Sequence, residues 1–310
     1  MKLRIFSAAF SLLALTLFFS SCKKEGSTSN EDLSAETSTH SDDQSRFSAE
    51  ADAAANDANT VLELTAGFTG KPGDLQSLFC DATVVVDTSG NPRTITVTFD
   101  GTNCLGNRTR TGVIILSMPQ GTRWNQPGAS VSLTFQNYKV TRVRDNKSLT
   151  FNGTMTYTNV SGGLLINLPN LNNITHTATS SNMSVTFDNG TQRTWQVARQ
   201  RVYTYSNGVV ITINGLHSEN GVTGITEWGT NRFGRTFTTR IDQPVVLRQD
   251  CAFRVGSGKV VHTTPAYTAS TTFGLDAAGN PTACPGNSNY YMKVEWTGQG
   301  GNTRTVILPY

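Results

Sequence analysis

The stretch "RTITVTFDG", residues 93–101, alternates apolar and polar side chains. Ile95, Val97 and Phe99 occupy every second position, and threonines separate them. Because successive residues of a strand point to opposite sides, a period of two places these three side chains on one face. The stretch therefore predicts a half-buried β-strand with a threonine-rich face turned toward solvent.

The same alternation recurs along most of the chain after residue 80. It is found in "SVSLTFQNY" (130–138), "SLTFNGTMTY" (148–157), "MSVTFDNG" (183–190), "VVITINGL" (209–216) and "RTFTTRI" (235–241). Asn-Gly pairs, which favour tight hairpin turns, begin at Asn152, Asn189, Asn207, Asn214 and Asn220. We expect an all-β fold of about 14–16 strands, too many for one flat sheet, and so an antiparallel sandwich or stacked sheets.

Composition agrees with a β-rich protein that functions outside the cytosol. Charged residues make up 15% of the 310-residue chain, below the usual quarter, and small polar residues take their place. The formal net charge is +3. Without Lys2 and Arg4 the 25 basic residues become 23, which face 22 acidic ones. A nearly neutral chain argues against nucleic acid as a partner.

The N-terminal segment has the pattern of an export signal. Lys2 and Arg4 precede the apolar run 5–19, which is too short for a comfortable bilayer span. Two serines then precede Cys22, an arrangement that resembles the bacterial lipobox. We expect residues 1–21 to be a lipoprotein signal peptide and Cys22 to carry a diacylglycerol. The alternative is an ordinary secretory signal with an incidental cysteine.

The residues after Cys22 indicate a destination. Lys23 stands where an aspartate would retain a lipoprotein in the inner membrane, so the outer membrane is expected. Residues 23–25, Lys-Lys-Glu, also resemble in part the surface-export signal of Bacteroidota lipoproteins. Exposure at the cell surface is therefore a further expectation, with the inner face of the outer membrane as the alternative.

The remaining chain divides into three parts by composition. Residues 22–45 are polar and of low complexity, which predicts a lipidated flexible tether. Residues 46–79 predict a short helical or linker segment, with a helix near 48–60 that Ser48 caps. Residues 80–310 form the β-rich domain. Because "DTSGNP" (87–92) recurs as "DAAGNP" (276–281), that domain is expected to contain two similar halves, 80–205 and 206–310, unless the repeat is independent turn chemistry.

Four cysteines remain once Cys22 is assigned to lipid, an even number for an oxidising compartment. Three connectivities are possible, and local pairing of Cys80 with Cys104 and of Cys251 with Cys284 is the simplest. Metal binding is the alternative, but it needs close Cys or His spacing that the sequence lacks. The four histidines, His40, His176, His217 and His262, are scattered. We expect no metal and no cofactor.

Two glutamates are candidates for a sugar-cleaving pair. Glu227 and Glu295 are each followed by a tryptophan, a combination suited to a glycosidase. A core tryptophan beside an outward glutamate explains both equally well, so no catalytic residue is assigned. The aromatic residues that could stack on carbohydrate are Trp124, Trp195, Trp228 and Trp296, with Tyr203 and Tyr205. The alternative is that these rings pack the core.

Two segments, 90–116 and 226–260, resemble an uncharacterised family of Bacteroidota outer-membrane lipoproteins. In that family a strand ends in Phe-x-Gly-x-x-Cys, and an Arg-x-Arg-x-Gly motif follows. Here the first motif is Phe99, Gly101 and Cys104, and the second is Arg108, Arg110 and Gly112. The resemblance covers most of residues 80–290 and is weakest near "CPGNSNYY" (284–291). It implies location and fold class, and it brings no activity.

The sequence thus supports two hypotheses on function. The first is a lipid-anchored outer-membrane or cell-surface protein without catalytic activity, which binds glycan or an envelope protein or has a structural role there. The second is a polysaccharide-acting enzyme that uses Glu227 and Glu295. The membrane, through the N-terminal lipid, is the expected partner in both.

Overall fold

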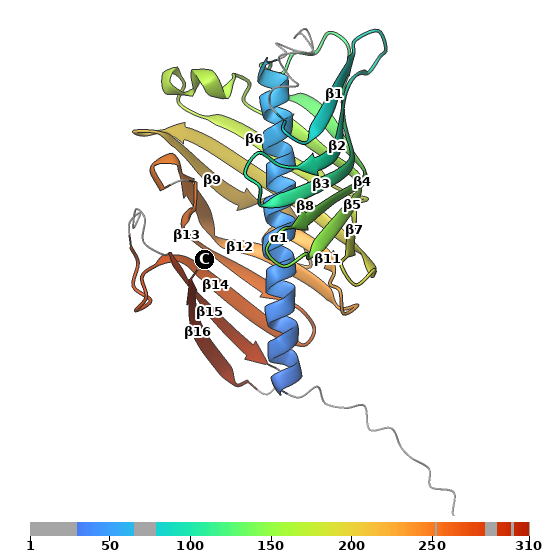
Figure 1. Cartoon of the computed structure of the whole chain (residues 1–310). Helices are drawn as coiled ribbons and strands as arrows, with labels where there is room; N and C mark the ends of the chain where they lie inside the picture. Colours follow the sequence, from blue (N-terminus) through green and yellow to red (C-terminus); the bar gives the residue numbers. More distant parts are fainter. Residues whose placement is uncertain (1–29, 65–78, 252, 283–289, 299–300, 310) are drawn as a thin grey trace, which may run out of the picture.

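The computed structural model describes residues 30–64, 79–251, 253–282, 290–298 and 301–309. These residues form one antiparallel sheet of 16 strands and one long helix, α1 (Asn30–Leu64), which runs along a face of the sheet (Figure 1). The predicted all-β fold with a helix near its N-terminus is confirmed, and so is the expected number of strands. Among the helices of the described ranges, none is both long and apolar enough to cross a membrane.

The strands of the described residues fall into two halves along the chain. The first half contains β1 (Ala82–Asp87), β2 (Arg93–Thr102), β3 (Arg108–Met118), β4 (Ala129–Arg142), β5 (Ser148–Asn159), the 3-10 helix η1 (Leu165–Asn170), β6 (Ile174–Ser180), β7 (Ser184–Phe187) and β8 (Gln192–Tyr205). The second half contains β9 (Val209–Gly215), β10 (His217–Glu219), β11 (Val222–Thr230), β12 (Thr236–Arg248), η2 (Gln249–Cys251), β13 (Val255–Thr263), β14 (Tyr267–Leu275), β15 (Tyr291–Gly298) and β16 (Thr303–Pro309).

Strand order follows chain order almost throughout. The path is β1-β2-β3-β4-β5-β6-β8-β11-β12-β13-β14-β15-β16. Strand β7 pairs with β5 and β8 beside β6, while β9 pairs with β8 and β12, and β10 with β11. The predicted boundary at 205/206 falls inside the β8–β9 hairpin, where Tyr205 lies opposite Val209. One continuous sheet therefore runs through both predicted halves, instead of two stacked sheets.

The alternation that predicted the strands determines which face is buried. In β2, Ile95, Val97 and Phe99 are each at most 3% exposed. Val97 lies opposite Ile114 of β3, which is also buried. This apolar face is the one that α1 covers, so the helix and one side of the sheet form the main core.

Helix α1 is longer than the sequence analysis predicts. It begins at Asn30 instead of near Ser48, and its 35 residues span about 52 Å. Residues 30–45 of the predicted flexible tether are therefore helical, and that part of the prediction is wrong. Glu36, His40 and Asp43 are buried at helical spacing. Because all three are polar, the helix does not show an apolar stripe in the sequence, although one face of it is buried.

The middle of α1 is packed through small residues. Four alanines on the buried face, Ala51, Ala54, Ala55 and Ala58, are each at most 4% exposed. Without longer side chains, the helix backbone approaches the sheet closely. Phe47, one turn earlier, is fully buried and stacks on Trp195 at a ring-centroid distance of 4.7 Å.

Three histidines are buried in this core. His40 of α1 lies against His262 of β13 with ring centroids 4.1 Å apart, and His176 accepts or donates a hydrogen bond with the Tyr157 hydroxyl at 2.7 Å. Burial lowers the pKa of His176 and of His262 to about 3. It also holds the pKa of His40 well below its usual value, and His262 and Arg232 add to the effect. All three rings are neutral at pH 7.

These shifts predict a loss of stability in mild acid. The unfolded chain binds a proton at each histidine below about pH 6.5, whereas in the folded chain His176 and His262 do not bind one until about pH 3. As the pH falls between these limits, each of these two histidines therefore lowers the free energy of unfolding by up to about 1.4 kcal/mol per pH unit. In His262→Gln, the slope of unfolding free energy against pH, measured by urea titration between pH 6 and 4.5, should fall by about that amount.

Stability at pH 7.5, where the histidines are neutral in both states, provides the reference for this comparison. Carboxylates such as Asp42 and Asp52 contribute equally to the variant and the wild type. An unchanged slope in the His262→Gln variant would contradict a buried, neutral His262.

Candidate functional site

Helix α1 is attached to the sheet by a row of ion pairs between its carboxylates and basic side chains of the sheet. The pairs are Glu36–Arg235, Asp42–Arg142, Asp42–Lys147, Asp43–Arg232, Glu50–Arg108, Asp52–Arg199, Asp52–Arg201 and Asp57–Arg110. A buried charge that loses its partner is strongly destabilising. The acidic helix is therefore the electrostatic complement of this arginine-rich face.

The most deeply buried of these charges surround Glu227 of β11, which is fully buried. One of its carboxylate oxygens accepts hydrogen bonds from Arg199 and from the Ser48 hydroxyl. The other accepts the indole N–H of Trp195 at 3.0 Å. Arg199 also donates to Asp52 of the helix at 2.6 Å. Both oxygens of Glu227 are thus occupied by protein donors and closed to a substrate.

Asp52 remains ionised at the centre of this network. Burial alone would raise its pKa, but Arg201 and Arg199 outweigh burial and bring the pKa below its usual value. Burial lowers the pKa of the Arg199 guanidinium, and Asp52 opposes that effect. The network consists of matched charges that hold α1 in place.

The two candidate catalytic glutamates lie far apart. Cross-strand pairs connect the two glutamate strands step by step. Glu227 lies opposite Thr239, Thr239 opposite His262, His262 opposite Ala269, and Ala269 opposite Trp296. Residues directly opposite one another share a face, so Trp296 faces the helix side and Glu295, its neighbour, faces the other side.

Three strands separate the strands of the two glutamates, which places Glu227 and Glu295 about 19 Å apart along the sheet. Glycosidase carboxylates lie roughly 5–10 Å apart. The hypothesis of a Glu227–Glu295 pair is therefore wrong. Glu295 instead forms an ion pair with Lys293 at 3.3 Å.

The tryptophans do not form a common platform for sugar. Trp124 and Trp195 are at most 1% exposed, so stacking on carbohydrate is wrong for these two and core packing is right. Trp228 is half-buried, and His217 stacks on it with ring centroids 4.0 Å apart. Trp296 is half-buried against the small cluster around Tyr267.

The two tyrosines named with the tryptophans divide in the same way. Tyr203 of β8 is 2% exposed and belongs to a small core cluster with Leu168 and Ile174. Tyr205, two residues further on, is 50% exposed. Tyr203 is thus a core residue, and Tyr205 is half-exposed at the end of its strand.

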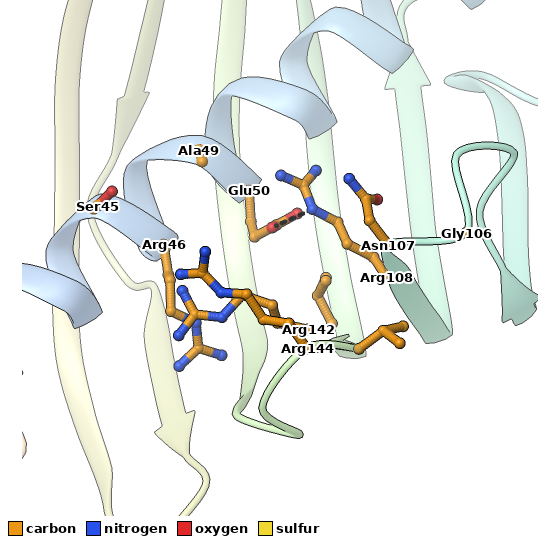
Figure 2. A pocket seen from close by; sticks show the side chains of 11 residues that line it. Ser45, Arg46, Ala49, Glu50, Gly106, Asn107, Arg108, Arg142 and Arg144 are labelled. Atoms are coloured by element: carbon orange, nitrogen blue, oxygen red, sulfur yellow. Dashed lines mark ion pairs between the residues drawn. The ribbon is translucent and has the colours of Figure 1, made fainter. Parts of the chain in front are cut away.

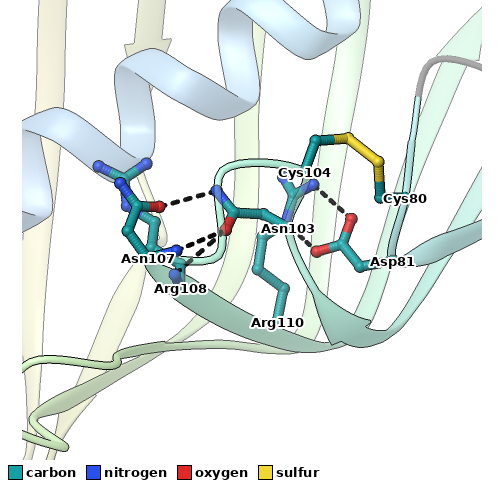
Figure 3. Close-up of a disulfide and its surroundings, with 7 residues drawn as sticks. All are labelled: Cys80, Asp81, Asn103, Cys104, Asn107, Arg108 and Arg110. Atoms are coloured by element: carbon teal, nitrogen blue, oxygen red, sulfur yellow. Dashed lines mark hydrogen bonds and ion pairs between the residues drawn. A yellow bond between two sulfur atoms is a disulfide. The ribbon is translucent and has the colours of Figure 1, made fainter.

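Cys80 and Cys104 form the predicted disulfide, with an S–S distance of 2.03 Å (Figure 3). Cys251 is also disulfide-bonded, whereas Cys22 and Cys284 lie outside the described residues. The predicted pairing of Cys251 with Cys284 and the lipidation of Cys22 therefore stay predictions.

The disulfide holds a loop that positions an arginine. Next to Cys104, the Asn103 side chain accepts hydrogen bonds from the backbone N–H groups of Asn107 and Arg108 (Figure 3). Asp81, next to Cys80, binds Arg110 through two hydrogen bonds of 2.6 and 2.7 Å. The bridge and these bonds together direct the start of β3 toward the helix.

The Arg-x-Arg-x-Gly motif has a structural explanation. Both arginines, Arg108 and Arg110, are among the side chains that pair with α1. Gly112 has a φ of 94° at the point where the β3–β4 register shifts, and a Cβ there would lie 2.2 Å from the Asn137 carbonyl oxygen. The motif thus supplies two partners for the helix and the bulge that follows them.

An open pocket lies between α1 and the ends of β3 and β4. It has a volume of about 530 Å³, within the range of small-molecule sites. The lining residues are Ser45, Arg46, Ala49, Glu50, Gly106, Asn107, Arg108, Val140, Arg142, Val143 and Arg144. Figure 2 shows the guanidinium groups of Arg46, Arg142 and Arg144 gathered at one end, and the Arg108–Glu50 ion pair at the other. We call this site the arginine pocket.

Sequence reasoning missed the arginine pocket. Its arginines come from three segments, 46, 108 and 142–144, and the first of these lies at the edge of the predicted tether. The available signal was the basic character of "NRTR" (107–110) and "RVR" (142–144) beside turns. In the described residues, the structure places no group of three or more His, Cys, Asp or Glu side chains that could hold a metal ion.

The buried network predicts unequal effects for the two glutamates. Glu227→Ala removes one of the two carboxylates that bind buried Arg199 and the acceptor of the Trp195 N–H, and it should lower the free energy of unfolding by about 3 kcal/mol. Glu295→Ala removes a partly exposed ion pair and should change it by no more than about 1 kcal/mol. Chemical denaturation monitored by tryptophan fluorescence measures both variants. Similar values for the two would contradict the structural role of Glu227.

The chain was compared with protein-family models, with curated proteins and with solved structures, and none of the three comparisons finds a match. The resemblance to Bacteroidota lipoproteins therefore stays an expectation.

Proposed function

We propose that the protein is a lipid-anchored, non-catalytic binding protein of the bacterial outer membrane. The observation that carries this proposal is the arrangement of polar groups on the helix-facing side of the sheet. Carboxylates and arginines there are paired with one another across the α1 interface, while the arginine pocket beside them is open. The open pocket gives a ligand a place to bind, whereas the buried acids hold the helix on the sheet through their ion pairs.

The polysaccharide-acting enzyme is the less favoured alternative. That hypothesis depended on Glu227 and Glu295, which lie on opposite faces and on well-separated strands. The proposed partners are the membrane, through lipid on Cys22, and a glycan or envelope protein, with no role for nucleic acid.

The long helix changes the geometry expected at the membrane. Eight peptide units separate Cys22 from Asn30, where α1 begins. At no more than about 3.6 Å per residue, these units reach at most about 29 Å. A lipid on Cys22 would therefore hold the start of the helix within that distance of the bilayer surface.

Fatty-acid labelling tests the anchor. Cells that express the protein are given an alkyne fatty acid, and the protein is captured and its label is read in a gel. Wild type should carry the label and Cys22→Ser should not, because the serine hydroxyl does not replace the thiol that receives the lipid. Equal label in Cys22→Ser and wild type would contradict lipidation at this residue.

A glycan array tests the binding role. Purified protein should bind a subset of the glycans on the array and should leave them intact when the products are analysed by mass spectrometry. Cleavage of a bound glycan would overturn the non-catalytic proposal in favour of an enzyme.

A further inference from the structure

Arg46 is the one helix residue of the arginine pocket whose charge matches that of the sheet. It lies on α1 among acids that pair with arginines, yet it faces Arg142 and Arg144. The residue is 8% exposed, and its Nη1 atom has no hydrogen-bond partner among the described residues. A buried guanidinium N–H without an acceptor is costly, so the site is incomplete as it stands.

The other arginines of the pocket differ in how closely carboxylates bind them. Arg142 is bound by Asp42 at 3.0 Å and by Asp145, and Arg108 is bound by Glu50 at 3.1 Å. Arg144 is 74% exposed and approaches Asp145 only to 4.0 Å. Arg46 and Arg144 therefore have N–H donors available for a ligand, whereas the ion pairs of Arg142 and Arg108 hold those two side chains in place.

The charges around Arg46 favour an anionic ligand. Burial lowers the pKa of Arg46, and the nearby Arg142 lowers it further. Asp42, Asp43 and Asp188 oppose that effect, but none of them forms an ion pair with Arg46 in the described structure. An anion between Arg46 and Arg144 would supply the missing acceptor and relieve the repulsion between the guanidinium groups.

We propose that the arginine pocket binds a tetrahedral oxyanion, a phosphate or sulfate ester. Guanidinium groups donate paired hydrogen bonds to such groups, and the donors of Arg46 and Arg144, which approach from the helix and from the end of β4, can bind different oxygens of one tetrahedron. The volume of about 530 Å³ accommodates a sugar that bears the ester. This inference rests on the non-catalytic binding role proposed above and names the chemical class of its ligand. The ester can belong to an envelope glycan or to a lipid headgroup, and both present the same chemistry.

Calorimetric titration of the full-length protein in detergent tests the proposal. The probes are inorganic phosphate, inorganic sulfate, a sugar 6-sulfate and sodium acetate, all at one ionic strength. Saturable binding of the phosphate and sulfate probes, at least about tenfold tighter than that of acetate, is expected. Mixed micelles that contain phosphatidic acid are then compared with the sugar sulfate. The tighter of the two identifies the source of the ester.

Three arginine variants locate the site. Arg46→Gln should weaken phosphate binding by at least about tenfold, and Arg144→Gln should weaken it by a smaller factor. Arg240→Gln is the control, since Arg240 pairs with Asp242 and does not line the pocket. It should bind phosphate within about twofold of wild type, which a single exposed charge pair allows.

A second measurement separates binding from folding. Because no carboxylate of the described residues forms an ion pair with Arg46, Arg46→Gln should unfold at a temperature no lower than that of wild type in buffer without phosphate or sulfate. Adding phosphate should raise the unfolding temperature of wild type and not that of Arg46→Gln.

Absence of saturable phosphate or sulfate binding, or equal binding by wild type and Arg46→Gln, would overturn the inference. Neither result affects the non-catalytic role, which the glycan array measures separately. Conversely, glycan cleavage would overturn that role while phosphate binding at Arg46 is still observed.

Discussion

The pairing of α1 acids with arginines of the sheet is the constraint on which the rest of the structure depends. Arg199 and Arg201 are each 4% exposed on the face of the sheet that α1 covers. Without Asp52 of the helix, Arg201 would lose the carboxylate that binds it, and Arg199 would retain Glu227 of the sheet. The cost of an unpaired buried charge exceeds that of most single contacts, so the sheet requires this helix in one register. The helix equally requires the sheet, because its acids Asp43, Glu50 and Asp52 form their ion pairs with arginines of the sheet face.

The same constraint explains the site. Along most of α1, a negative helix residue meets a positive sheet residue, and nothing is left over for a ligand. At Arg46 the sign on the helix is reversed, and its Nη1 atom has no acceptor among the described residues. The arginine pocket is therefore the place along α1 where the charges of the helix and the sheet do not match. An anion bound from solution is the simplest way to balance the positive charge there. The Cys80–Cys104 bridge and the loop beside it hold Arg108 at the pocket's edge, independently of any ligand.

Sequence reasoning predicted the strands because their signal is local. The alternation of Ile95, Val97 and Phe99 with threonines follows directly from side chains that point to opposite faces of a strand. The short separation between Cys80 and Cys104 likewise favoured the disulfide that the structure contains. Strand alternation also placed Glu227 and Trp228 on opposite faces correctly. It could not say which face is buried, and here the charged residue is inside and the tryptophan is half-buried on the other face. That choice depends on Arg199 and Ser48, which are distant in sequence.

The extent of α1 was missed for a related reason. Polar residues such as Glu36, His40 and Asp43 normally indicate exposed or disordered chain, and here each is buried against a partner from the sheet. Their partners lie about 190–220 residues away, so no window of the sequence shows the match. The arginine pocket shares this property, since it is assembled from three segments.

Hydrogen–deuterium exchange along residues 36–62 tests the central claim most directly. If these residues form a helix docked by buried ion pairs, their amides should exchange as slowly as those of β4 and β5, which lie in the same core. Exchange of residues 36–47 within seconds at neutral pH, as in a flexible tether, would contradict the account.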